Sequence, residues 1–406
     1  MAFENNPRLS RRDFLKMAGV VSAGLAYWSL PPWLHAAAKM ASGSRTKTLV
    51  VLFQRGAADG LNTVIPFNDP LYASSRPTVG IKSGILDLNG TFGFHPSLAP
   101  LLPLWKSGNL GVVHCAGSHD GTRSHFDAQD YMETGTPGVK GTGDGWLNRT
   151  IASFPAAGVD PLSAIAISQR PPRILRGEIP VTSMTSLKDY NFVQGSDAAR
   201  TFEEMYSSSQ GLLGKAGVAT SDSVKKLQSL LSSNEKPSYV GYGNGTLGHS
   251  LSDLASILKS GAEVKVAFID IGGWDHHTGE SYRLGSLLED WAKGLSAFWK
   301  DLGDKARDVV VVSMTEFGRT VFENGSQGTD HGHGGVMFLL GGPVKGGKVY
   351  GKWSGLEKEN LYEGRDLPVT TDFRQVLCEA LGKHLGVNKL DSVFPGFKPG
   401  SNLGWL

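Results

Sequence analysis

The sequence has few cysteines and almost no net charge, and each scarcity excludes some classes of function. It has 406 residues and two cysteines, Cys115 and Cys378, and it contains no cysteine-based metal site or nucleophile motif. Cys115 ends an apolar run and Cys378 lies in an expected helix, so a disulfide and two buried thiols both remain open. The 40 basic and 38 acidic residues leave a formal charge of +2, which indicates neither a nucleic-acid partner nor a basic membrane-binding patch.

Long apolar runs are also missing. The run from Met17 to Leu30 is broken by Gly19 and Gly24 and is followed by Pro31. A membrane-spanning helix needs about 20 apolar residues, so we expect no stable membrane span. The chain shows no internal repeat and no long low-complexity tract, which favours a single domain over an array.

The N-terminus has the features of a twin-arginine signal peptide. Residues 10–16 read Ser-Arg-Arg-Asp-Phe-Leu-Lys, an apolar stretch follows, and Ala36-Ala37-Ala38 is a candidate cleavage site. A buried N-terminal helix that happens to contain two arginines is the alternative. We expect residues 1–38 to direct export to the periplasm, with the twin-arginine translocase as partner. This route serves proteins that fold, or load a cofactor, before they cross the membrane.

The rest of the chain alternates between strand and helix patterns. Six apolar runs predict strands buried on both faces, at residues 46–53, 110–115, 164–167, 264–269, 309–314 and 336–340. An apolar stripe at residues 284–302 predicts a helix, and shorter helices are expected at 96–106, 124–133 and 372–385. This alternation predicts an α/β domain over residues 45–406, with a mostly parallel central sheet, helices on both faces and a helical insertion at about 194–260.

Two candidate catalytic groups follow the first strands. Asp59 precedes Gly60 in the loop after the first strand, so it either forms a plain turn or supplies a carboxylate to a metal. Ser124 stands between Arg123 and His125 at the start of an expected helix. Such a serine caps the helix or, at its positive end, acts as a nucleophile toward an anionic ester.

Two later loops contain clusters of metal-ligand residues. One loop reads Asp275-His276-His277, and another reads Asp330-His331-Gly332-His333. Carboxylate and imidazole together suit zinc, manganese or another divalent first-row metal, whereas solvated loop residues are the alternative.

These loops are expected to meet in space. Parallel strands present their carboxyl ends at one edge of a sheet, where ligands bind in such folds. Six of the eleven histidines lie in three loops that follow predicted strands: His119, His125, His276, His277, His331 and His333. Their convergence predicts a metal site with one or two divalent ions.

Several of these segments resemble one bacterial family. The arginine pair, Arg55–Asn62, Arg123–Asp127, Gly272–His277 and Thr329–Gly335 resemble the domain-of-unknown-function family 1501 (DUF1501), over nearly all of the chain from about Thr46. That family is similar in fold to alkaline phosphatases and sulfatases, which hold one or two divalent metals beside a Ser, Thr or formylglycine nucleophile. The resemblance implies an alkaline-phosphatase-like fold, Ser124 as nucleophile, and a set of metal ligands comprising Asp59, Asp275, His277, Asp330, His331 and His333.

The chain departs from the superfamily pattern in three places, one of which is that the usual spacing of the Asp-x-x-x-His pair is not kept. The position of the usual Asp-His pair holds Thr315-Glu316-Phe317-Gly318, so either Glu316 replaces a ligand or the second metal site is altered or absent. The Cys-x-Pro-Ser-Arg motif of sulfatases is missing, which argues against formylglycine chemistry.

The leading hypothesis is an exported metal-dependent hydrolase that acts on a small-molecule or polymer ester of phosphate or a related anion. Ser124 would attack the ester while Arg123 or Arg319 held its non-bridging oxygens. Two alternatives remain open: a mononuclear metallohydrolase that uses metal-bound water, and an exported binding protein that has lost catalysis.

Overall fold

A computed structural model describes residues 45–406, apart from 156–159, 161, 169–171, 188–220, 224 and 230–236. The chain divides into two compact units, Met1–Arg45 and Thr46–Leu406, and the elements described below belong to the second. The expected signal peptide at residues 1–38 lies outside the described residues, as does much of the expected insertion at 194–260. The described end of that insertion includes α10 (Thr246–Lys259).

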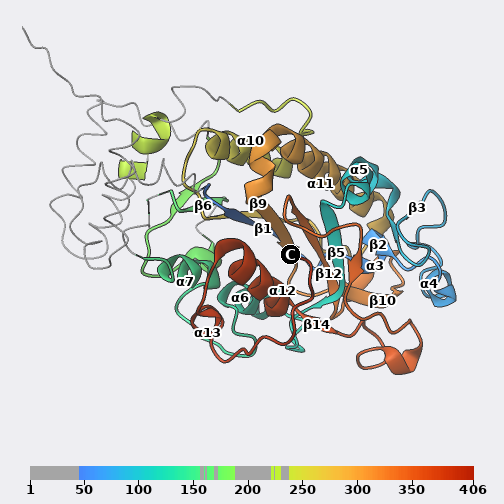
Figure 1. The fold of residues 1–406 in the computed structure, drawn as a ribbon. Coiled ribbons are helices and arrows are strands. Elements are labelled where there is room, and N and C mark those ends of the chain that lie inside the picture. The colour runs from blue at the N-terminus through green and yellow to red at the C-terminus, as the bar shows by residue number, and fades with distance from the viewer. Residues whose placement is uncertain are drawn as a thin grey trace, which may run out of the picture. The chain divides into compact units, whose positions relative to one another are not determined.

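A mostly parallel sheet forms the centre of this unit (Figure 1). Among the described residues, nine strands join in the order β13-β5-β12-β9-β1-β8-β6-β7, with β14 beside β5. Only β12 runs antiparallel to its neighbours in this sheet. The strands are β1 (Thr48–Gln54), β5 (Leu110–Gly117), β6 (Ala164–Ile167), β7 (Thr182–Met184), β8 (Val266–Ile271), β9 (Val309–Met314), β12 (Gly335–Gly341), β13 (Val349–Tyr350) and β14 (Thr371–Asp372).

Helices and short strands make up the rest of the described fold. Two small sheets consist of β2 (Val64–Ile65), β4 (Gly93–Phe94) and β3 (Leu86–Asp87), and of β10 (Arg319–Glu323) and β11 (Thr329–His331). The other α-helices are α3 (Gly60–Thr63), α4 (Pro70–Ser75), α5 (Leu102–Lys106), α6 (His125–Thr134), α7 (Trp146–Ala152), α11 (Glu280–Leu302), α12 (Phe373–Glu379) and α13 (Leu390–Val393). Short 3₁₀ turns are η1 (Pro96–Leu101), η3 (Arg173–Leu175), η4 (Gly303–Asp308) and η5 (Lys358–Asn360), and η6 (Ala380–Leu385) is a π-helix.

The sheet is buried on both faces because its central strands carry apolar side chains on both sides. On β1, Val50 and Leu52 pack with α10 and α11, whereas Leu49, Val51 and Phe53 pack with α7, α12 and α13. Figure 1 shows α10 and α11 on one side of the sheet and α6, α7 and α12 on the other. The predicted α/β fold, with a mostly parallel sheet covered on both faces, is confirmed.

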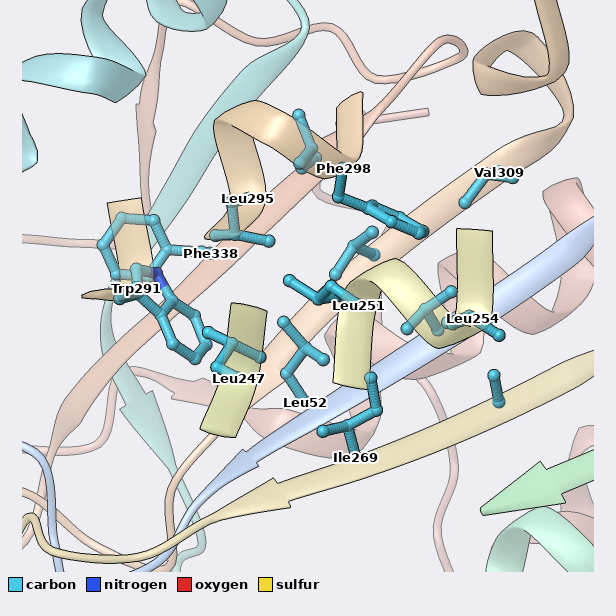
Figure 2. Close-up of a cluster of buried hydrophobic side chains, with 14 of the residues drawn as sticks. Leu52, Leu247, Leu251, Leu254, Ile269, Trp291, Leu295, Phe298, Val309 and Phe338 are labelled. Atoms are coloured by element: carbon cyan, nitrogen blue, oxygen red, sulfur yellow. The ribbon is translucent and has the colours of Figure 1, made fainter. Parts of the chain in front are cut away.

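The side of the sheet covered by α10 and α11 is built from two helical stripes (Figure 2). Each stripe repeats at the spacing of one or two helical turns, which places its side chains on the face toward the strands. In Figure 2 they lie over Leu52 and Ile269 of the sheet. The stripe residues are Leu247, Leu251 and Leu254 on α10 and Trp291, Leu295 and Phe298 on α11.

Both cysteines are buried free thiols. Cys115 lies in β5 and Cys378 in α12, and burial raises the pKa of each thiol to about 12. The sequence left a disulfide and two buried thiols open, and the structure shows two buried thiols. Among the described residues, no helix is long and apolar enough to cross a membrane.

Candidate metal centre

The topology brings the predicted loops to one edge of the sheet. Because β5, β8 and β9 run parallel, the residues that follow them leave the sheet at the same edge. His125 begins the helix after β5, Asp275 and His277 follow β8, and Glu316 follows β9. The β10–β11 hairpin then brings His331 back to the start of the antiparallel strand β12. The expected convergence of these loops is confirmed.

Three imidazole rings surround one carboxylate at this edge. His125, Asp275 and His331 each offer a ligand atom, and these atoms lie within 4.8 Å of one another. His277 joins them, because its Nε2 is 3.0 Å from Asp275 Oδ1 and 3.0 Å from His331 Nε2. His331 Nε2 is 3.2 Å from Asp275 Oδ1, and His125 Nε2 is 3.5 Å from Asp275 Oδ2. We call these four residues the His₃Asp cluster.

Each ring of the cluster is held at its other nitrogen by an oxygen atom. The Nδ1 of His125 lies 2.7 Å from Glu316 Oε1, and the Nδ1 of His277 lies 2.9 Å from Asp330 Oδ1. The Nδ1 of His331 lies 2.9 Å from the backbone carbonyl of Arg123. An oxygen acceptor at Nδ1 favours the tautomer whose proton sits there, which leaves the Nε2 lone pair directed at the cluster. This second shell is typical of metal-ligating histidines.

The arrangement of these ring nitrogens suits binding to a divalent metal better than hydrogen bonding among themselves. The Nε2 atoms of His277 and His331 face each other at 3.0 Å, and with both protons at Nδ1 two lone pairs would repel there. His125 Nε2 is buried and makes no hydrogen bond with any described residue. A cation among these atoms would satisfy all three nitrogens. Three imidazoles with a carboxylate suit zinc and also other first-row metals, so manganese stays open.

Buried charges hold Asp275 and Glu316 in their ionised forms. Burial alone would raise the pKa of the Asp275 carboxyl, but Arg319, which donates to Asp275 Oδ1 over 2.7 Å, lowers it below its ordinary value. Burial opposes ionisation of Glu316 as well, yet the hydrogen bonds from His125 and Gln129 lower its pKa. The bond to Glu316 also raises the pKa of His125. Both carboxylates therefore carry negative charge at neutral pH, as a metal site needs.

Glu316 and Arg319 each hydrogen-bond a residue of the cluster. Glu316 accepts hydrogen bonds from His125, from the Gln129 side chain over 2.8 Å and from the Gly56 amide over 2.8 Å. Arg319 is 2% exposed and donates to Thr329 as well as to Asp275. Arg319 therefore supports Asp275 directly, and its predicted role in holding substrate oxygens stays a prediction.

Arg123 contributes its backbone to the cluster, while its side chain is engaged elsewhere. The guanidinium donates to Asp366 Oδ2 over 2.7 Å and to Glu363 Oε2 over 2.6 Å. Asp366 is fully buried, and its other oxygen accepts from Arg365 Nε over 2.9 Å. Arg365 also donates to the His331 carbonyl over 2.7 Å. Asp366 thus bonds the side chains of both arginines. Of these, Arg123 holds the His331 ring through its backbone carbonyl, and Arg365 bonds the His331 carbonyl.

Five predicted ligands lie outside the cluster. The carboxylates of Glu316 and Asp330 bond ring nitrogens of the cluster, and their own role as ligands stays a prediction. The other three are Asp59, His276 and His333. Asp59 caps α3 and forms a buried ion pair with Arg76; burial alone would raise its pKa, but Arg76 lowers it to about 2. His276 is buried, which lowers its pKa to about 4, and its ring nitrogens have no hydrogen-bond partner among the described residues. His333 is buried and stacks on Tyr362, with ring centroids 4.1 Å apart. The ligand role of these three residues stays a prediction, and we leave them out of the proposed metal set.

Ser124 lies at the N-terminus of α6, between two residues that build the cluster. Its hydroxyl accepts a hydrogen bond from the Asp127 amide over 3.5 Å, as an N-cap does, and its side chain is exposed. The preceding carbonyl, of Arg123, holds His331, and the next residue is His125. The hydroxyl is therefore accessible on the residue that precedes His125 in the chain, and its role as nucleophile stays a prediction.

Sequence reasoning did not single out His125 as a candidate ligand, nor Gln129 as a support of the Glu316 that holds His125, nor Asp366 as a support of the arginines that hold His331. His125 was visible among the six loop histidines, but its place beside Ser124 favoured the serine as the functional residue. Asp366 belongs to no motif, and its partner Arg123 is 243 positions away in the chain. Such a pairing is decided by the fold, so no local pattern could have indicated it.

Comparisons with known proteins identify a family and several solved structures to which the chain is similar. A family model described as "Protein of unknown function (DUF1501)" matches residues 91–394, well over half of the chain, which confirms the resemblance read from the motifs. No curated protein matches the sequence.

Among solved structures, the chain is similar to the C-terminal periplasmic domain of EcEptC from Escherichia coli, at 13% identity and a TM-score of 0.37, over 89% of this chain and 90% of that one. The same domain in complex with Zn aligns at 13% identity and a TM-score of 0.36 over 74% of each chain. Alkaline phosphatase from the Antarctic bacterium TAB5 aligns at 12% identity and a TM-score of 0.32, over 74% of this chain and 93% of that one. These likenesses concern the fold alone.

Proposed function

The chain belongs to the DUF1501 family of proteins of unknown function, and we propose that it is an exported metal-dependent hydrolase of phosphate or related anionic esters. One observation carries the proposal: three histidine Nε2 atoms converge on Asp275, and each of the three rings is fixed at Nδ1 by an oxygen acceptor. This is the donor set and the second shell of a metal site.

The His₃Asp cluster would hold the ion, with Glu316, Asp330 and the Arg123 carbonyl fixing the rings. A divalent metal bound there would supply Lewis-acid stabilisation of negative charge on the ester oxygens. Arg319 keeps Asp275 ionised and oriented, so the carboxylate does not need to reorganise when the ion binds. Asp275 and His277 are 42% and 41% exposed at their side chains, which leaves the cluster open to an incoming ester.

Ser124 is the proposed nucleophile. Its exposed hydroxyl lies at the positive end of a ten-residue helix, where an anionic group is stabilised. The oxygen would form a bond to the phosphorus or sulfur atom as the bond to the leaving alcohol breaks. The hydroxyl proton would pass to solvent or to that leaving group, and water would then release the inorganic anion from the serine.

A mononuclear hydrolase that forms no covalent serine intermediate is the second candidate. It is favoured by the single ligand cluster found among the described residues and by the use of Ser124 as a helix cap. Trapping labelled phosphate on Ser124 during turnover would support the covalent route, and its absence under conditions of rapid hydrolysis would support this alternative.

Hydrolysis of 4-nitrophenyl phosphate and 4-nitrophenyl sulfate tests the proposal. We expect the metal-loaded protein to hydrolyse at least one of them and to lose that activity with a chelator or with His331→Ala. Ser124→Ala should lower turnover about 10³-fold or more while metal content stays the same. His249→Ala, which removes an exposed histidine on α10, is the matched control. It should change neither turnover nor metal content. A metal-loaded protein without activity on any phosphate or sulfate ester would favour the binding-protein alternative.

Export is part of the proposal and rests on the arginine pair at residues 11 and 12. Arg11→Lys with Arg12→Lys in the full chain should retain the protein in the cytoplasm of a host with the twin-arginine system. Unchanged periplasmic recovery of this double variant would contradict the assigned route.

A further inference from the structure

A pocket of about 1020 Å³ is lined by chain neighbours of two residues of the His₃Asp cluster. Phe126 and Gln129 of α6 line one part of it, directly after the ligand His125. Gly272 and Trp274 line another part, directly before the ligand Asp275. The two walls thus continue from the residues that would hold the metal, and a volume of this size matches a site for a whole organic ligand. An ester bound at the cluster would extend its organic part into this pocket.

Arg55 is one of three arginines in the pocket wall, with Arg173 and Arg176, and neighbouring side chains engage it. It donates to Asp270 over 2.7 Å, to Glu133 over 2.9 Å and to Gln129 over 3.0 Å. An alkyl chain would cover these polar groups without replacing their contacts with water, which is unfavourable. A ligand that is rich in hydrogen-bonding groups avoids this cost.

The wall also offers an exposed aromatic ring. Phe126 lines the pocket and is 92% exposed. The apolar face of a ligand ring would cover this side chain.

We infer that this pocket binds the sugar part of the substrate, so that the enzyme acts on phosphate or sulfate esters of carbohydrates. Hydroxyl groups both donate and accept, which suits a wall of paired guanidinium and carboxylate groups, and the C–H face of a sugar ring suits an aromatic side chain. The inference rests on the proposed hydrolase function for the ester step, while sugar binding itself can be measured without it.

Gly272 offers a way to fill the pocket without disturbing the backbone. A Cβ added there meets no atom within 4 Å, and its φ is outside the left-handed region. Gly272→Trp should therefore fold and obstruct the pocket. Gly143→Trp is the matched control, because Gly143 has the same freedom but does not line the pocket.

The test uses the full metal-loaded protein and two readouts. The first compares kcat/KM for the 6-phosphates and 6-sulfates of glucose, galactose, mannose and N-acetylglucosamine with kcat/KM for 4-nitrophenyl and octyl phosphate. We expect one sugar ester to be preferred at least tenfold, and Gly272→Trp, unlike Gly143→Trp, to reduce that preference at least tenfold. The second measures binding of the four corresponding methyl glycosides by calorimetry.

The outcomes separate the two claims. Glycoside binding that Gly272→Trp abolishes, in a protein without esterase activity, would sustain the sugar site and contradict the hydrolase function. Hydrolysis of aryl or alkyl esters with no preferred sugar ester and no glycoside binding would overturn the sugar site alone. A preference for octyl phosphate would assign the pocket to a lipid-like group and would also overturn it.

Discussion

At the scale of single residues, the proposed metal site depends more on which nitrogen of each histidine carries the proton than on the number of histidines. Glu316, Asp330 and the Arg123 carbonyl each accept at Nδ1, so His125, His277 and His331 present their Nε2 lone pairs to one point. A ring without such an acceptor could turn or change tautomer. In the proposed metal site, this second shell would determine affinity for the ion almost as strongly as the ligands would.

Glu316→Gln tests this dependence. An amide in place of the carboxylate weakens the bond that orients His125 and removes a buried negative charge near the ion. We expect metal affinity, measured by competition with a chelator, to fall about 10–100-fold. Glu323→Gln is the control, because that carboxylate bonds Thr78 and Val79 outside the cluster. Equal affinities for the two variants would contradict the role of Glu316.

Asp366→Asn tests the support behind His331. The buried carboxylate bonds both Arg123 and Arg365, and these residues hold the ring and the backbone of His331. We expect weaker metal binding and a free energy of unfolding lower by about 1–3 kcal/mol, because two charge-assisted bonds are lost. Asp304→Asn breaks an exposed pair with Arg307 and should have little effect on either quantity. If only stability changes in Asp366→Asn, the residue does not position His331.

Local patterns could predict some site residues and not others. Asp275, His277 and His331 stand in dense clusters of ligand residues after predicted strands, and the structure brings all three together. Asp59 and the Arg123 side chain looked equally suitable, but Arg76 and Asp366 engage them in ion pairs. Whether a carboxylate is free for a metal depends on such partners, which the local sequence does not reveal.

At the scale of elements, α6 connects the sheet to the cluster. Ser124 caps it, His125 begins it and Gln129 bonds Glu316 from its second turn. Gly135 ends it in the left-handed conformation, with φ of 68°, and packs beneath Phe394. The position of α6 therefore determines where His125 lies.

Gly135→Ala should destabilise this helix end. An added Cβ would lie 2.7 Å from Phe394 Cδ1, and the left-handed φ adds strain of about 1 kcal/mol for a residue with a side chain. Gly108→Ala isolates the strain, because Gly108 has a φ of 76° and no atom within 4 Å of the added Cβ. The melting temperature should fall more in Gly135→Ala than in Gly108→Ala. An equal fall in the two variants would mean that small shifts relieve the contact with Phe394.

Some helices and strands could be predicted from the sequence, and others could not. The six continuous apolar runs all form strands, since burial on both faces leaves a strong pattern. The β10–β11 hairpin was not predicted, although it carries Arg319, Asp330 and His331. Its strands are short and largely polar, and long-range contacts such as the bridge between Thr320 and Asp366 hold it in place.

At the scale of the whole molecule, two buried histidines make the fold sensitive to acid. Burial lowers the pKa of His95 to about 4 and that of His114 to about 4. In the unfolded chain each has its ordinary pKa of about 6.5, so the unfolded state binds more protons between these values. Stability is therefore complete above about pH 6.5 and falls toward pH 4, by up to about 1.4 kcal/mol per pH unit for each histidine.

Chemical unfolding at a series of pH values measures this loss. A chelator should be present, so that protonation of the metal ligands does not contribute through metal release. His114→Gln should flatten the slope between pH 6.5 and 4, because it removes one of the buried histidines whose pKa is lowered. A wild-type unfolding free energy that is constant over this range would contradict the buried, neutral state of both rings.

The central claim, that this edge of the sheet is a metal centre, is tested most directly by elemental mass spectrometry of the purified full-length protein. We predict about one zinc or manganese ion per chain in the wild type and in His249→Ala, and a loss of most of that metal in His125→Ala and in His331→Ala. A wild-type protein without stoichiometric metal, or variants that retain the full amount, would contradict the assignment of the His₃Asp cluster.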